Sequence, residues 1–207
     1  MKTFRLILLI PALLLMNFRS TSPELTSAER KVVIDYLTST KKDLLKSIKG
    51  LSTEQLNFKS SAESWSIAEC VEHIALSETN LFGMIQGTLK EAAQAERRSE
   101  IKLSDEAVFE AFSDRSYKVK TKEGFVPTGK FGSHEATVNE FLEKRQKSID
   151  YIKNTSDDLR NHFFTFPVES LGTLDSYQLF FFMAGHTNRH RLQIEEIKGH
   201  PEFPKKK

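Results

Sequence analysis

Apolar residues recur along the chain with the three- and four-residue spacing of amphipathic helices. The first such stripe comprises Val33, Leu37, Leu44, Ile48 and Leu51. Only Thr40 interrupts it. A capping box from Thr26 to Glu29 precedes the stripe, and Gly50 supplies a C-terminal stop. These signals predict a helix between Thr26 and Gly50.

Further helices follow from the same pattern. A second capping box, Ser66 to Glu69, begins a helix that we expect to run to about Arg97, although Gly83 and Gly87 weaken its middle. Shorter helices are expected over residues 53–58 and 105–115. A long helix carries the apolar residues Val138, Phe141, Leu142, Ile149 and Ile152. The last helix begins with the capping box Asp175 to Gln178 and ends at Gly199.

Two segments between these helices, residues 117–133 and 161–173, are predicted to be irregular. The first contains Gly124, Pro127, Gly129 and Gly132, which break regular structure. The pattern therefore predicts an all-α fold, a four-helix bundle with long connections after the second and third long helices.

The first residues have a different character. Lys2 and Arg5 precede an apolar run from Leu6 to Met16, which is shorter than the roughly 20 residues of a membrane-spanning helix. These are the proportions of a secretory signal peptide. We expect a signal segment over residues 1–22, with no clear cleavage site, and a single bundle domain over residues 23–207. The domain would then be extracytoplasmic, periplasmic or secreted; an uncleaved segment would tie it to a membrane.

Net charge and cysteine content limit the binding partners and the cross-links that the domain can have. Removing residues 1–22 takes away three basic residues and no acidic one, so the formal net charge falls from +2 to −1. A near-neutral domain gives no electrostatic reason to bind nucleic acid. Cys70 is the only cysteine, so no intrachain disulfide forms. A homodimer is compatible with a bundle of this size, although no residue selects it.

Three histidines carry the candidate chemistry. His186 and His190 are four residues apart, so on a helix both imidazoles lie on one face, where they can bind one metal ion. They continue the apolar row of the last helix, and His73 lies in a comparable row of the second long helix, so all three are expected to face the interior. The alternative is that the pair arises by chance and that His73 is a hydrogen-bonded core residue. The two signals support each other only if these helices are adjacent.

The segments Trp65 to Ile74 and His186 to Ile194 together resemble the DinB-like (DinB/YfiT) superfamily. The first contains W-S-x-x-E-x-x-x-H and the second H-x-x-x-H. The resemblance covers about residues 26–199. It implies a four-helix bundle that binds a divalent metal, usually zinc or nickel, through three histidines, which by position are His73, His186 and His190. Members of this family include thiol-dependent S-transferases, isomerases and metal hydrolases; an exported protein fits poorly with a cytosolic thiol cosubstrate.

The leading hypothesis is a metal-dependent enzyme, a hydrolase or thiol S-transferase, acting on a small-molecule substrate. Its alternative is a non-enzymatic envelope module that binds metal or a small ligand. Cys70 is either a fourth ligand or, as we favour, a buried core thiol. Glu69 is either a proton-transfer group or, as we favour, part of the helix cap. Aromatic residues of the two irregular segments are expected to line a pocket mouth.

A third hypothesis is an oligomeric helical interaction protein with a degenerate site that holds no metal. The remaining histidines are interpreted as surface or capping residues. They are His134, His162 and His200.

Overall fold

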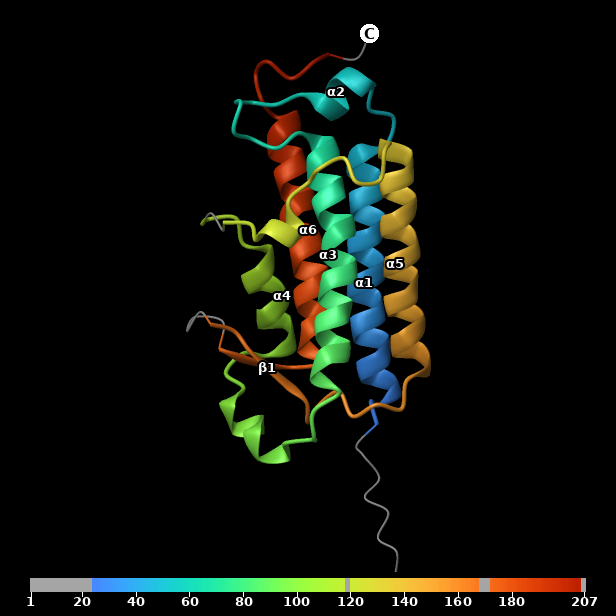
Figure 1. Ribbon diagram of the computed structural model, residues 1–207, viewed down its shortest axis with the longest axis vertical. Coiled ribbons are helices and arrows are strands. Elements are labelled where there is room, and N and C mark those ends of the chain that lie inside the picture. Colours follow the sequence, from blue (N-terminus) through green and yellow to red (C-terminus); the bar gives the residue numbers. More distant parts are fainter. Residues whose placement is uncertain (1–23, 118–119, 168–171, 206–207) are drawn as a thin grey trace, which may run out of the picture.

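The computed structural model describes residues 24–117, 120–167 and 172–205. The predicted signal segment, residues 1–22, lies outside the described residues. Four long helices run alongside one another (Figure 1): α1 (Ser27–Ile48), α3 (Ile67–Thr88), α5 (His134–Asn154) and α6 (Gln178–Lys198). The predicted all-α four-helix bundle is thereby confirmed, with its long connections after the second and third of these helices.

Shorter elements occupy the connections. They are α2 (Thr53–Asn57), the 3₁₀ helix η1 (Ala95–Glu100), α4 (Asp105–Ser113), the 3₁₀ helix η2 (Glu123–Phe125), and the strands β1 (Phe163–Thr165) and β2 (Thr173–Asp175). Helix α4 packs on α6, and the two strands pair antiparallel. None of the described helices combines the length and the apolar character needed to cross a membrane.

The predicted starts of α1 and α3 are confirmed by their hydrogen bonds. The Thr26 and Ser66 hydroxyls accept from the backbone N–H groups of Glu29 and Glu69, and each glutamate carboxylate accepts from the backbone N–H of its cap residue. The predicted start of the last helix was wrong. The Asp175 carboxylate accepts from the backbone N–H of Gln178, at 2.7 Å, but Asp175 belongs to β2, and α6 begins at Gln178 with Tyr177 as its N-cap residue.

Two further expectations were wrong. Helix α3 ends at Thr88 rather than near Arg97, because residues distant in sequence bind the polar groups of its last residue. The Thr88 hydroxyl is hydrogen-bonded to the Ser176 hydroxyl, and the Thr88 carbonyl oxygen lies 3.0 Å from Nδ1 of His162. The segment 161–173 was expected to be irregular, yet it contains β1 and the start of β2. Strands of three residues are too short to show an alternating pattern in the sequence.

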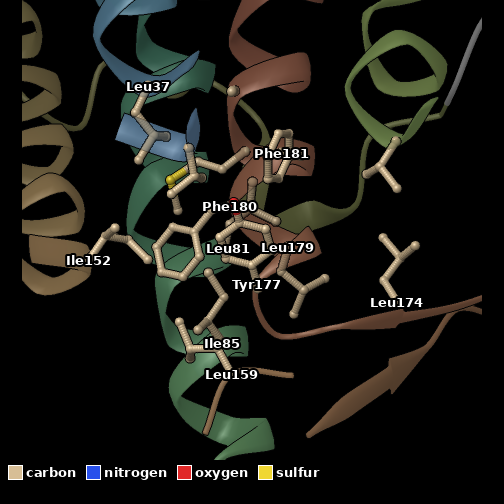
Figure 2. Close-up of a cluster of buried hydrophobic side chains, with 14 of the residues drawn as sticks. Leu37, Leu81, Ile85, Ile152, Leu159, Leu174, Tyr177, Leu179, Phe180 and Phe181 are labelled. Atoms are coloured by element: carbon tan, nitrogen blue, oxygen red, sulfur yellow. The ribbon is translucent and has the colours of Figure 1, made fainter. Parts of the chain in front are cut away.

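The core consists of two hydrophobic clusters, one toward each end of the bundle. In the first cluster, side chains of all four long helices converge, among them Leu37 of α1, Ile85 of α3, Ile152 of α5 and Phe180 of α6 (Figure 2). Leu44 of α1, Ile74 of α3, Phe141 of α5 and Ile194 of α6 belong to the second cluster.

A polar layer separates these clusters. Arg145 of α5 is fully buried, and its guanidinium donates to both carboxylate oxygens of Glu78 at 2.9 and 2.5 Å. It also donates to the hydroxyls of Thr40 at 2.9 Å and Thr187 at 2.7 Å, and to the Leu37 carbonyl at 2.8 Å. Each long helix contributes to this layer, which explains why Thr40 interrupts the apolar stripe of α1.

Candidate metal centre

His73 of α3 and the pair His186 and His190 of α6 converge at one point. One nitrogen atom of each residue lies within 4.8 Å of those of the other two, and the Nε2 atoms of His73 and His186 are 3.1 Å apart. Helices α3 and α6 pack against each other, as the hypothesis requires. His73 and His190 are buried, as expected, whereas His186 retains partial exposure.

The second nitrogen of two of these rings is held by a carbonyl oxygen. Nδ1 of His73 lies 2.6 Å from the Phe125 carbonyl, and Nδ1 of His190 lies 2.9 Å from Oε1 of Gln193. A carbonyl only accepts hydrogen bonds, so each Nδ1 carries the proton and each Nε2 keeps a free lone pair. Arg115 donates to the same Gln193 oxygen at 3.3 Å and fixes the orientation of that amide.

Aromatic rings surround the three imidazoles. The centroid of the Trp65 ring lies 4.8 Å from that of His73 and 5.9 Å from that of His190. Phe125 lies 6.4 Å from His73, and Phe182 lies 6.2 Å from His186. These rings pack against the imidazoles and restrict the orientation of their planes.

The surroundings keep the imidazoles neutral. Burial lowers the pKa of His73. Burial, together with the neighbouring His190 and His73, holds the pKa of His186 well below its ordinary value of 6.5. Burial and the nearby His73 lower the pKa of His190 to about 3. Neutral imidazole is the form that coordinates metal ions, so at neutral pH the group is ready to bind a cation.

The geometry fits a transition-metal ion. Nitrogens about 2.1 Å from a tetrahedral zinc ion are about 3.4 Å apart, close to the observed separation of His73 and His186. Among the described residues, the potential ligand group contains these three imidazoles and no carboxylate. Imidazole nitrogen suits zinc, nickel, copper or iron better than calcium or magnesium, and three protein ligands leave coordination positions open.

The favoured roles of Glu69 and Cys70 agree with the structure. The Glu69 carboxylate accepts from the Ser66 backbone N–H and from Nζ of Lys59, both at 2.7 Å, so it caps α3. Cys70 is fully buried in the second hydrophobic cluster, where burial raises the pKa of its thiol to about 12.

The other histidines and the irregular segments have varied outcomes. His162 caps the end of α3, whereas His134 begins α5 and His200 packs on Phe58, with 5.5 Å between ring centroids. The segment 117–133 supplies Phe125 to the site. The segment 161–173 approaches it only indirectly, because Phe166 packs on Phe182 rather than on a histidine.

The Phe125 carbonyl and the Gln193 amide, which orient two of the imidazoles, were not predicted from the sequence. Gln193 lies three residues after His190, a helical spacing that could have indicated a partner on the same face. The Phe125 carbonyl is a backbone group of a distant loop, so no residue type signals its role.

Comparison with known proteins gives three findings. A family model described as the DinB superfamily matches residues 36–194. The uncharacterized protein YuaE of Bacillus subtilis (strain 168) is 30% identical over 151 residues, which are 73% of this chain and 88% of that protein. A solved structure described as "YfiT from Bacillus subtilis is a probable metal-dependent hydrolase with an unusual four-helix bundle topology" matches with a TM-score of 0.56 and 15% identity, over 84% of this chain and 89% of that chain. At this identity the structural match shows a shared fold.

Proposed function

Because the chain belongs to the DinB superfamily, we propose that it is a divalent-metal-dependent enzyme that acts on a small molecule. His73, His186 and His190 would hold the ion, with zinc or nickel as the expected metals. One observation carries this proposal: three neutral imidazoles from two helices converge, and carbonyl oxygens on two Nδ1 atoms leave the Nε2 lone pairs for the ion. A buried group of this kind is well suited to a cation.

Each residue of the proposed metal site has a separate role. A divalent ion acts as a Lewis acid toward a water, a thiol or a substrate oxygen. His73 and His190 hold their donor nitrogens in place through Phe125 and Gln193. Trp65 packs against both of these rings and restricts their orientation.

Hydrolysis is the reaction class that we favour over thiol S-transfer. The solved relative YfiT is described as a probable metal-dependent hydrolase. Cys70, the chain's only thiol, is buried in the core and cannot act as the sulfur nucleophile, so S-transfer would depend on a separate thiol cosubstrate. An extracytoplasmic location, which we propose from residues 1–22, would also separate the domain from cytosolic thiols.

The alternative is a non-enzymatic envelope module that binds metal or a small ligand. One observation favours a version without catalysis: the 3.1 Å separation of the His73 and His186 Nε2 atoms is also a hydrogen-bond distance. A single proton shared between these atoms would satisfy both rings without an ion.

Turnover by metal-depleted and metal-loaded protein tests the proposal. The protein is stripped with a chelator, reloaded with zinc or nickel, and assayed with aryl ester, amide and phosphoester substrates and for thiol transfer to an aromatic electrophile. Hydrolysis that requires the metal, is lost in His190→Ala and persists in the control His200→Ala would support the enzyme. Stoichiometric metal binding without turnover of any substrate would instead favour the binding module.

A further inference from the structure

We propose that Glu72 is a positioning residue for His73, acting through the loop that follows η2. Glu72 precedes His73 on α3, and its side chain holds the loop whose Phe125 carbonyl orients the His73 ring. The inference rests on the proposed function, because it assigns Glu72 the task of keeping one ligand of the metal site in its binding form.

The Glu72 carboxylate binds three consecutive backbone amides. The N–H groups of Thr128 and Lys130 donate to Oε1 at 3.0 and 2.8 Å, and that of Gly129 donates to Oε2 at 3.0 Å. Gly129 has a φ of +74°, a left-handed conformation that turns successive N–H groups toward one anion. Glu72 is only 6% exposed, so these charge-assisted bonds form largely away from water.

The clamp and the His73 contact belong to one short stretch of chain. Phe125 lies three residues before Thr128, and its carbonyl accepts from Nδ1 of His73 at 2.6 Å. The segment after η2 crosses α3 on its way to α5 (Figure 1), so α3 holds it at two adjacent residues, 72 and 73. Release of the amides from Glu72 would therefore let the Phe125 carbonyl move away from the imidazole.

The consequence for His73 is chemical as well as structural. While the Phe125 carbonyl accepts from Nδ1, the proton stays there and Nε2 remains available. Without that acceptor the proton can move to Nε2, the nitrogen that faces His186. Metal binding would then require the ring to change tautomer and to be reoriented first.

The same contacts argue against a direct role for Glu72 at the metal. Its two oxygens already accept three hydrogen bonds, and the described group of potential ligands contains the histidines alone. Glu72 would thus act on the ion only through the loop and His73.

The test combines zinc affinity with the tautomer of His73. Zinc affinity is measured by competition with a chromophoric chelator, and long-range proton–nitrogen NMR spectra of the metal-free protein report which His73 nitrogen carries the proton. Glu72→Gln should bind zinc about 10- to 100-fold more weakly, the usual effect of removing support from a metal ligand. It should also lose the Nδ1-protonated signature of His73.

Two further variants keep the test decisive. Gly129→Ala disturbs the three amides from the loop side, because alanine is strained at the positive φ of this residue. The added Cβ meets no atom within 4 Å, so no steric clash adds to that strain. It should reproduce both effects even if Glu72→Gln fails to fold. Glu29→Gln, which changes a capping glutamate of α1, is the control and should leave affinity within about twofold and the tautomer intact.

The two proposals fail in different ways. A folded Glu72→Gln protein with wild-type zinc affinity and an unchanged His73 tautomer would overturn the role of Glu72 and leave the metal site standing. A wild-type protein that binds no zinc or nickel would overturn the proposed function, while the tautomer measurement would still show whether Glu72 positions His73.

Discussion

The buried ion pair between Arg145 and Glu78 yields a prediction about stability. The side chains of these residues are 0% and 1% exposed, and the pair lies between the two hydrophobic clusters, with partners on all four long helices. The perturbation is to remove one charge at a time, with Glu78→Leu and Arg145→Met, and then both together. Each single variant leaves the other charge buried without its counterion.

The expected magnitudes follow from burial. Breaking a buried pair by removing one partner costs about 3–5 kcal/mol, whereas replacing both partners by apolar residues is often close to neutral. The double variant still removes the Arg145 bonds to the Thr40 and Thr187 hydroxyls and to the Leu37 carbonyl, each worth about 1 kcal/mol. We therefore expect about 3–5 kcal/mol for each single variant and about 1–3 kcal/mol for the double variant.

Urea unfolding followed by far-ultraviolet circular dichroism measures these free energies. A chelator is present in every sample, so that metal binding does not add to the stability of any variant. We expect strong non-additivity, with the double variant more stable than either single variant. Single-variant losses below about 1 kcal/mol, or losses that simply add in the double variant, would refute it.

Three further predictions concern close packing, the thiol and pH. Gly185→Ala should lower the free energy of unfolding by about 1–3 kcal/mol in urea titrations, because the added Cβ would lie 2.6 Å from a backbone oxygen of α4. The control is Gly83→Ala: Gly83 is exposed and its added Cβ would meet no atom within 4 Å, so this variant should not be destabilised. Because burial raises the pKa of Cys70 to about 12, a thiol reagent at about pH 8 should label it only in denaturant, and Cys70→Ser should not weaken metal binding in a chelator competition. Burial raises the pKa of Glu69, but the hydrogen bonds from Lys59 and the capping serine outweigh this effect and leave the pKa below 4.5. The stability from these bonds should be complete above that pH and be lost as the pH falls through the lower folded pKa, so Glu69→Gln should flatten the acid side of a plot of Tm against pH.

The starts of α1 and α3 were predictable because their signals are local. Thr26 and Ser66 each lie three residues before a glutamate, and the cap forms within that single turn. The end of α3 was not predictable, because Ser176 and His162 reach it from the far end of the chain. The polar layer around Arg145 was not predictable for the same reason. In the sequence, Thr40 appears only as a break in the apolar stripe of α1, and its partner Arg145 lies 105 residues away.

In the candidate metal site, too, the local features could be predicted and those that depend on tertiary packing could not. The spacing of His186 and His190 is a property of one helix, so their common face could be predicted. Their meeting with His73 depends on the packing of α3 against α6, which the spacing alone does not determine. The orientation of the His73 ring by the Phe125 carbonyl lies beyond any residue pattern, because every residue has such a carbonyl.

The most direct test of the central claim is the metal content of the protein purified without added metal and without a histidine tag. Elemental analysis of the wild type, His73→Ala, His186→Ala and His190→Ala is compared with circular dichroism of the same samples. We expect about one zinc or nickel ion per wild-type chain, lost in each variant while helicity persists. A wild type that carries no metal even after reconstitution, or variants that retain the full amount, would contradict it.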